Sequence, residues 1–160
     1  MYRIGQGFDA HRFKKGRRLI ICQVEIPYEY GLEGHSDADV ALHALCDAIL
    51  GAIGDRDIGY YFPPTDLSIK GISSKKILDF VLDKMQKKNY EIVNVDLTLI
   101  AERPKFSPYI EDLKNNLSKL LNLPKENVGI KATTAEKMIF TDGIACLAIV
   151  LLRKKGNKTG

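Results

Sequence analysis

Residues 37–53 read DADVALHALCDAILGAI, and the rest of the chain is best understood outward from this stretch. After Asp37 it is apolar except for Asp39, His43 and Asp47, which recur at every fourth position and therefore share one face of a helix. A histidine on such a stripe can direct one ring nitrogen outward while a carboxylate orients the other. We predict a helix over residues 37–53 that carries this polar stripe and ends near Gly54.

The segments on either side alternate between strand and helix periodicities. The first helix takes its N-cap from Ser36 or Asp37. Strands are predicted at residues 2–9, 17–26, 92–101, 128–133 and 143–152. Further helices are predicted at residues 73–88 and 107–121, with a long loop over residues 54–72. We expect one α+β domain (mixed α/β, two-layer) over residues 1–152, with one sheet of about four main strands covered by about three helices.

Positive charge is concentrated at the C-terminus. Arg153, Lys154, Lys155 and Lys158 lie in the last eight residues and account for the whole formal net charge of +4. Such an end is usually solvated and frayed, so we predict a basic, disordered tail over residues 153–160 and no nucleic-acid partner. The longest apolar run near this end, residues 144–152, is too short to span a membrane, so we expect no membrane partner.

The three cysteines, Cys22, Cys46 and Cys146, lie far apart in apolar stretches and form no CxxC pair. They are typical of small core residues in a reducing compartment rather than of thiolate zinc ligands. No secretory signal precedes the first strand, so we expect a cytoplasmic protein, or one of a plastid-type organelle if a transit peptide has been removed.

The histidines lie between residues 11 and 43, each near an aspartate. Asp9 and His11 stand two positions apart on the first strand, so their side chains point to the same side. With His43 they offer one carboxylate and two imidazoles, which suits zinc with its fourth position open to a substrate oxygen. On spacing alone, a buried and hydrogen-bonded histidine is the commoner arrangement.

Two further clusters carry polar groups of the kinds that bind phosphate or a polyol. Residues 131–137 bring hydroxyls and a carboxylate to a strand end, where they can contact phosphate and a divalent cation. The Thr133-to-Glu136 spacing is also that of a capping box, which spacing alone favours. Residues 57–59 and 62–66 lie in a loop stiffened by glycine and proline, where polar groups clamp a polyol or simply form turns.

Taken together, six ordered blocks resemble the 2-C-methyl-D-erythritol 2,4-cyclodiphosphate synthase family of the non-mevalonate isoprenoid pathway. The resemblance covers nearly the whole chain, in residues 3–11, 34–45, 57–66, 94–105, 131–137 and 143–146. It implies a homotrimer in which each active site is shared between neighbouring subunits.

The resemblance also implies a reaction. The substrate is 4-diphosphocytidyl-2-C-methyl-D-erythritol 2-phosphate, whose 2-phosphate attacks the β-phosphorus of its own diphosphate, so that CMP leaves and the cyclic diphosphate forms. The enzyme is then a divalent-metal-dependent phosphorus–oxygen lyase. Such a protein mainly positions two anionic phosphates and neutralises their charge.

Residue roles follow from the matching positions. The resemblance assigns one Zn²⁺ per active site to Asp9, His11 and His43, and Mg²⁺ or Mn²⁺ to Glu136. It makes His35 and Thr134 the catalytic residues that stabilise transition-state charge. The implied substrate contacts are Asp9, His11, His35, Ser36, Asp57, Ile58, Gly59, Phe62, Asp66, Ala101, Lys105, Phe106, Ser107, Thr133, Thr134, Glu136 and Phe140.

This chain departs from the family pattern near the start of its last strand. The connector around Phe140 is three residues shorter than usual and lacks an arginine, and Leu147 stands where a glutamate is frequent. Because both charges are lost together, we predict a more apolar channel along the trimer axis. Ala135 replaces a frequent threonine and Gln6 a frequent histidine, and neither change removes an implied metal ligand.

Two other functions fit parts of the same pattern. A zinc-dependent phosphoester hydrolase would activate water with the same ligands, and Asp39 or Asp66 could serve as its base. A non-catalytic nucleotide- or isoprenoid-binding trimer would keep the fold without the chemistry. The retention of the metal ligands together with Thr133, Thr134 and Glu136 argues against that second alternative.

Overall fold

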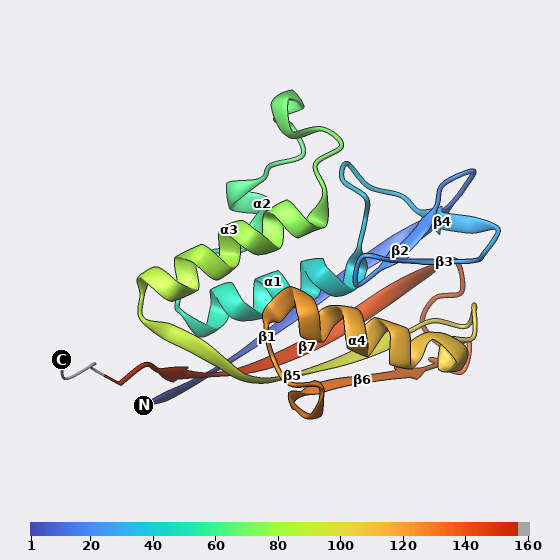
Figure 1. Ribbon diagram of the computed structural model, residues 1–160. Coiled ribbons are helices and arrows are strands. Elements are labelled where there is room, and N and C mark those ends of the chain that lie inside the picture. Colours follow the sequence, from blue (N-terminus) through green and yellow to red (C-terminus); the bar gives the residue numbers. More distant parts are fainter. Residues whose placement is uncertain (157–160) are drawn as a thin grey trace.

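The computed structural model describes residues 1–156 and forms a two-layer domain, with helices packed on one face of a five-stranded sheet (Figure 1). The strands lie in the order β4-β1-β7-β5-β6. Their bounds are β1 Tyr2–Lys15, β4 Tyr30–Leu32, β5 Tyr90–Ile100, β6 Val128–Thr133 and β7 Gly143–Lys154, and β2 Leu19–Ile21 pairs with β3 Val24–Ile26 in a separate hairpin. The helices are α1 Val40–Ala52, α2 Ile58–Tyr61, α3 Ser74–Lys87 and α4 Ile110–Leu121, with 3-10 turns η1 Leu67–Ile69, η2 Ser107–Tyr109 and η3 Lys125–Asn127. The predicted two-layer α+β class is confirmed.

The central strands determine which residues lie in one row across the sheet. β7 pairs antiparallel with β1 on one side and with β5 on the other, while β6 runs parallel to β5 at the edge. The register places Asp9 beside Cys146, Cys146 beside Leu99, and Leu99 beside Ala132. Asp9 and His11 therefore lie on a strand that is separated from β6 by two others.

Two glycines let α1 lie very close to β1. A Cβ atom added at Gly5 or at Gly7 would meet a backbone carbonyl oxygen of α1 at 1.9 Å. Side chains at these positions would push the helix away, so the glycine pair fixes where α1 crosses the sheet. That crossing brings His43 over Asp9 and His11.

The first helix begins later than its sequence pattern predicts. Its N-cap is Asp39 rather than Ser36 or Asp37, and the Asp39 carboxylate accepts a hydrogen bond from the Leu42 backbone N–H at 3.1 Å. Ala38 has a positive φ of 56°, which a helix cannot contain. The predicted start at residue 37 is therefore wrong by three residues, because a tertiary bend precedes the helix.

The other boundaries differ mainly where pairing is non-local. β1 runs to Lys15 rather than ending at residue 9, because it also pairs with β4, a short strand that was not predicted. The predicted strand over residues 17–26 is a hairpin that turns at Cys22 and Gln23, both with positive φ.

The helix predicted from Ser73 or Ser74 is confirmed, with Ser73 as its N-cap. The loop predicted over residues 54–72 contains the short elements α2 and η1, and the helix predicted over residues 107–121 begins as η2.

The predicted C-terminal tail starts too early. β7 continues through Lys154, so Arg153 and Lys154 belong to the sheet, and the Lys155 backbone N–H donates to the Asn89 carbonyl at 2.9 Å. Residues 157–160 of the predicted tail lie outside the described residues. The prediction for the cysteines is confirmed, because all three thiols are free and buried.

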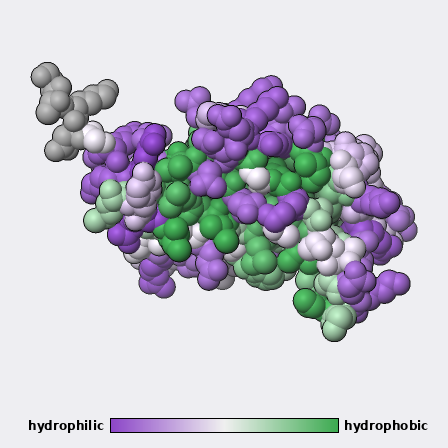
Figure 2. All heavy atoms as spheres, turned by 90° about the horizontal axis from the view of Figure 1, so that it is seen from below, coloured by the Kyte–Doolittle hydropathy of each residue, from purple (hydrophilic) through white to green (hydrophobic). Residues whose placement is uncertain are grey.

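The face of the sheet opposite the helices carries exposed apolar side chains. Ile4, Phe8, Leu147 and Ile149 are 76%, 56%, 44% and 54% exposed, and Phe8 pairs directly with Leu147. Figure 2 looks onto the molecule from this side and shows hydrophobic atoms gathered in the middle with hydrophilic atoms around them. We call these four residues the uncovered sheet face. Within residues 1–156, the helices are all too short or too polar to cross a membrane.

Candidate metal centre and substrate cavity

Asp9, His11 and His43 converge at one point, as predicted. His11 Nε2 lies 2.7 Å and His43 Nδ1 lies 3.3 Å from Asp9 Oδ2, and one ligand atom from each residue lies within 4.8 Å of the others. Burial raises the pKa of Asp9, but its contacts with the His11 and His43 imidazoles outweigh burial and lower that pKa below its ordinary value. The carboxylate is therefore ionised near neutral pH, as a metal ligand must be.

The orientation of His11 is fixed by a backbone group behind it. Its Nδ1 lies 2.7 Å from the Glu33 carbonyl oxygen, and a carbonyl can only accept, so Nδ1 carries the hydrogen. Nε2 is then the nitrogen that faces Asp9. Burial lowers the pKa of His11 and the contact with Asp9 raises it, with a net shift upward. The proton shared between His11 and Asp9 would have to leave before a metal ion could bind.

His43 is 8% exposed, and its outer nitrogen is held by hydroxyl groups. Nε2 lies 2.9 Å from Ser74 Oγ and 3.2 Å from Ser36 Oγ. The neighbouring acid of the stripe, Asp47, does not orient this ring within the described structure, because its Oδ1 accepts from the Ile58 backbone N–H at 2.9 Å. The stripe predicted as one polar surface therefore splits into a helix cap at Asp39, a candidate ligand at His43 and a loop anchor at Asp47.

A cavity of about 550 Å³ opens beside the three candidate ligands, and its size is that of a small-molecule site. Its walls come from β1, the segment over residues 34–36, α1 and the loop over residues 57–72. Lys70 brings an ammonium group to this wall. The sequence-predicted residues that line the cavity are Asp9, His11, His35, Ser36, His43, Asp57, Ile58, Gly59, Phe62 and Asp66.

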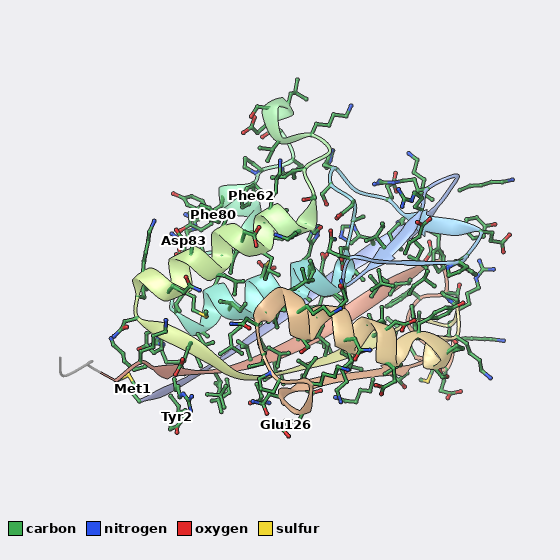
Figure 3. All side chains as sticks on the ribbon, viewed as in Figure 1. Met1, Tyr2, Phe62, Phe80, Asp83 and Glu126 are labelled. Atoms are coloured by element: carbon green, nitrogen blue, oxygen red, sulfur yellow. The ribbon has the colours of Figure 1, made fainter. Side chains whose placement is uncertain are left out.

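The loop wall of the cavity is tied to α3. The Tyr61 hydroxyl donates to Asp55, and Lys84 Nζ lies 3.1 Å from the other oxygen of the same carboxylate. Phe62 and Phe80 stack edge to face with ring centroids 5.1 Å apart, between α2 and α3 (Figure 3). These contacts hold α2, and with it the predicted polyol contacts, in one place.

The segment that carries His35 is held through its backbone. Arg17 donates to the Gly34 carbonyl at 2.8 Å and to the Ser36 carbonyl at 2.7 Å. The His35 carbonyl accepts from the Gly71 backbone N–H at 2.7 Å, which links this segment to the end of the loop wall. The exposed His35 imidazole thus stands on a fixed backbone beside the cavity.

The second predicted cluster lies after β6, and its side chains are exposed. No helix follows β6 in the described chain, so the capping-box interpretation of Thr133 and Glu136 is wrong. Instead, the backbone turns sharply through positive φ at Glu136 and Lys137, of 53° and 58°. Glu102 Oε1 stabilises this turn by accepting from the Ala135 N–H at 3.1 Å and the Lys137 N–H at 2.8 Å.

The predicted cytidine segment lies next to this second cluster. The Ala101 backbone N–H donates to the Thr133 carbonyl at 3.1 Å. Lys105 and Ser107 are exposed, whereas the Phe106 side chain is only 3% exposed and belongs to the core. Contacts from Phe106 to a ligand could therefore come only from its backbone. None of Ala101, Lys105, Phe106, Ser107, Thr133, Thr134, Glu136 and Phe140 lines the 550 Å³ cavity.

The predicted site residues therefore form two groups at different places on the sheet. The first group lies on β1, on α1 and on the segments before and after α1. The second group lies at and beyond the ends of β5 and β6. Because β7 and β5 separate β1 from β6, three strand spacings of about 4.8 Å each put the two groups about 14 Å apart. One diphosphate cannot bridge that distance within a single chain.

Several residues that shape the site were not predicted from the sequence. Ser74 was assigned only to a helix start, although it is fully buried against His43. Arg17 and Lys70 gave no motif signal. Glu102 lies within the family-like block over residues 94–105, but it is 35 positions from Lys137, so their contact leaves no local pattern in the sequence.

Comparison with known proteins agrees with this geometry. The sequence profile of the YgbB family matches residues 2–153. The chain is 51% identical over 158 residues to the 2-C-methyl-D-erythritol 2,4-cyclodiphosphate synthase of Lysinibacillus sphaericus, covering 97% of this chain and 100% of that one. It is 52% identical over 157 residues to the enzyme of the same name from Geobacillus thermodenitrificans, covering 96% and 98% of the two chains.

A solved structure of a 2-C-methyl-D-erythritol 2,4-cyclodiphosphate synthase, described as its CDP-bound form, superposes with a TM-score of 0.88 at 37% identity. The match covers 94% of this chain and 100% of that chain. Fold and site together define a two-layer α/β protein with an Asp-His-His cluster at a small-molecule cavity. The chain belongs to the YgbB family.

Proposed function

We propose that the chain converts 4-diphosphocytidyl-2-C-methyl-D-erythritol 2-phosphate to 2-C-methyl-D-erythritol 2,4-cyclodiphosphate with release of CMP. The observation that carries this proposal is the convergence of Asp9, His11 and His43 on the cavity wall of a YgbB-family chain. The enzyme would be a phosphorus–oxygen lyase, because a substrate phosphate rather than water attacks the β-phosphorus. We also propose a cytoplasmic location, which suits three buried, unpaired thiols.

We further propose that Asp9, His11 and His43 hold one Zn²⁺. The donor set fits this ion, because one carboxylate and two imidazoles leave a fourth position open, and both rings have their outer nitrogens occupied. When bound, zinc would polarise the diphosphate and offset its charge. Glu136 offers an exposed carboxylate that suits a harder ion, Mg²⁺ or Mn²⁺.

The side chains of the cavity would bring the reacting phosphates together. Asp57 and Asp66 can accept hydrogen bonds from polyol hydroxyls at the loop wall, while His35 and Lys70 can contact phosphate oxygens. Holding the 2-phosphate against the β-phosphorus removes most of the entropic barrier to their encounter. No general base is needed, since the attacking phosphate is already ionised near neutral pH.

We propose a homotrimer in which one subunit supplies the metal-cluster cavity and its neighbour supplies the Thr133–Glu136 turn. The separation of about 14 Å within one chain supports this arrangement, because both groups are needed at one diphosphate. Thr134 would then stabilise transition-state charge from across the interface. The cytidine contacts at residues 101–107 would come from the same neighbour, since Ala101 is bonded to Thr133.

The uncovered sheet face is the surface that such a trimer would bury. Exposing the four apolar side chains of this face to water is unfavourable for a monomer, and contiguous patches of this kind usually mark an interface. The pairing of Phe8 with Leu147 supports the predicted apolar axial channel, because leucine occupies the position of the frequent glutamate. Analytical ultracentrifugation tests the trimer: a single species near three times 17.9 kDa is expected, and a monomer would contradict it.

Phosphorus NMR of the purified protein with the diphosphocytidyl substrate, Zn²⁺ and Mg²⁺ tests the reaction. Two coupled resonances of a cyclic diphosphate, together with CMP, are expected. Linear phosphate products would instead indicate a hydrolase. Of the bases suggested for that alternative, Asp39 is fully buried, and its carboxylate accepts from the backbone N–H groups of Cys22, Gln23 and Leu42, so it cannot activate water.

A further inference from the structure

The His43 ring is backed by a buried pair of side chains that the reaction itself does not use. Ser74, the first residue of α3, is fully buried, and its Oγ lies 2.9 Å from His43 Nε2. The same hydroxyl contacts the Asp37 carboxylate. Ser73 already caps α3, so capping does not account for a hydroxyl at the next position.

Counting hydrogens determines the direction of this chain of contacts. The Ser74 hydroxyl has one hydrogen, and an ionised carboxylate can only accept, so Ser74 donates to Asp37. The Ser74 oxygen must then accept from His43, which requires the hydrogen of the imidazole to be on Nε2. Nδ1 consequently keeps its lone pair on the side of Asp9.

Asp37 is itself held in place by other donors. Its carboxylate accepts from the Ser74 backbone N–H at 3.2 Å and from Gln23 Nε2 at 3.0 Å. The Asp39 backbone N–H lies 3.3 Å from the other oxygen. All these neighbours are donors, so the carboxylate oxygens of Asp37 act as acceptors toward them and toward the Ser74 hydroxyl.

The two imidazoles of the cluster are thus oriented by different means. His11 donates to the backbone carbonyl of Glu33, which is present whatever side chain occupies that position. His43 has no such carbonyl at its outer nitrogen within the described structure and contacts two serine hydroxyls instead. The contact with Ser36 is the longer of the two, at 3.2 Å. Ser36 also lies on the cavity wall, where a bound substrate can compete with His43 for its hydroxyl.

We propose that Ser74, oriented by Asp37, is a positioning residue that fixes the tautomer of His43 so that Nδ1 faces the metal position. This proposal rests on the proposed metal site. It also gives the N-terminus of α3 a role in the chemistry, because a shift of that helix would release the His43 ring. Partners of this kind typically change metal affinity by about 10- to 100-fold when removed.

The experiment compares wild type with Ser74→Ala, with Ser74→Thr, which keeps the hydroxyl, and with Ser73→Ala as a matched control. Ser73→Ala weakens the same helix end without touching His43. Side-chain ¹⁵N NMR of the metal-free full chain at a pH of about 8, above the ordinary histidine pKa, reads the tautomer directly. Competition with a chromophoric chelator gives the zinc dissociation constant, and circular dichroism checks the fold.

Wild type, Ser73→Ala and Ser74→Thr are expected to carry the His43 hydrogen on Nε2, whereas Ser74→Ala should populate both tautomers and bind zinc about 10- to 100-fold more weakly. A wild-type His43 with its hydrogen on Nδ1 would overturn the proposal, even if Ser74→Ala does not fold. Equal zinc affinity in Ser74→Ala and Ser73→Ala would also overturn it. If wild type bound no zinc, the proposed metal site would fail, and the NMR result would still decide whether Ser74 orients the ring.

Discussion

The two halves of the proposed active site are built very differently. Around Asp9, His11 and His43 the side chains are mostly buried, and each ring has a partner behind it. Around Thr134 and Glu136 the side chains are exposed, and the turn depends on one carboxylate, that of Glu102. In the first half, one chain supplies both the candidate ligands and the groups that orient them. In the second half, one chain fixes the backbone of the turn, but the side chains of Thr134 and Glu136 stay exposed. This difference is expected if a neighbouring subunit covers the second half.

Replacing His43 should have the largest effect on function. His43→Ala removes one of three proposed zinc ligands, so metal content should fall below detection and cyclisation should almost vanish. His35→Ala is the matched comparison, because His35 lines the same cavity without belonging to the ligand cluster. That variant should keep its zinc and lose turnover only. Metal analysis and phosphorus NMR separate the two, and full activity in His43→Ala would remove the zinc assignment.

Disturbing the close packing of α1 on β1, which positions the first half of the site, should lower the free energy of unfolding. Gly7→Ala places a Cβ atom 1.9 Å from the Ala44 carbonyl oxygen, so α1 must move away from β1. We expect a loss of at least about 2 kcal/mol in the free energy of unfolding, measured by urea titration. Gly156→Ala is the control, because a Cβ atom there meets nothing within 4 Å. Equal stability of the two variants would mean that the close packing of α1 on β1 is not needed.

Releasing the turn of the second half should lower activity and leave zinc binding intact. Glu102→Ala removes the acceptor of two backbone N–H groups, and charged hydrogen bonds of this kind contribute about 1.5 to 3 kcal/mol. Turnover should therefore fall about tenfold or more. Glu102→Gln should restore much of it, because both N–H groups contact the same oxygen, which an amide can supply. A loss of zinc affinity in Glu102→Ala would show that the two halves are not independent.

The smallest effect on stability is expected at Asp55, whose contacts with Tyr61 and Lys84 tie the loop wall of the cavity to α3. The Tyr61 hydroxyl, helped by Lys84, lowers the pKa of Asp55 from its ordinary 3.8 to about 2. The folded pKa is depressed, so this contribution to stability is fully present above about pH 4 and is lost as pH falls toward about 2. Asp55→Asn should therefore be modestly less stable than wild type at neutral pH, with the difference closing at acid pH. Thermal midpoints measured from pH 7 to pH 2 test this, and a constant difference would contradict it.

Local sequence patterns predicted the secondary structure well where hydrogen bonding is local. The helix at residues 74–87 follows from its amphipathic spacing and its serine cap, and these depend only on neighbours in the chain. The patterns were wrong at the start of α1 and at the end of β1, where Asp39 and the β4 pairing involve residues far along the chain. Side-chain chemistry and family resemblance predicted that Asp9, His11 and His43 meet at one metal position, and the structure confirms that they converge. The hydrogen bonds that orient the two imidazoles could not be predicted, because they come from residues far along the chain.

What the sequence determined by itself was the identity of the reacting groups: two imidazoles and a carboxylate near the N-terminus, and hydroxyls with a carboxylate after the sixth strand. The tertiary structure alone decided how each group is oriented and which groups meet. Ser74 and His43 are 31 positions apart, and Glu102 and Lys137 are 35 apart, so neither contact leaves a local pattern. The register of the sheet likewise decided that the two halves stand about 14 Å apart, because strand order is set by long-range pairing rather than by the residues of any one strand.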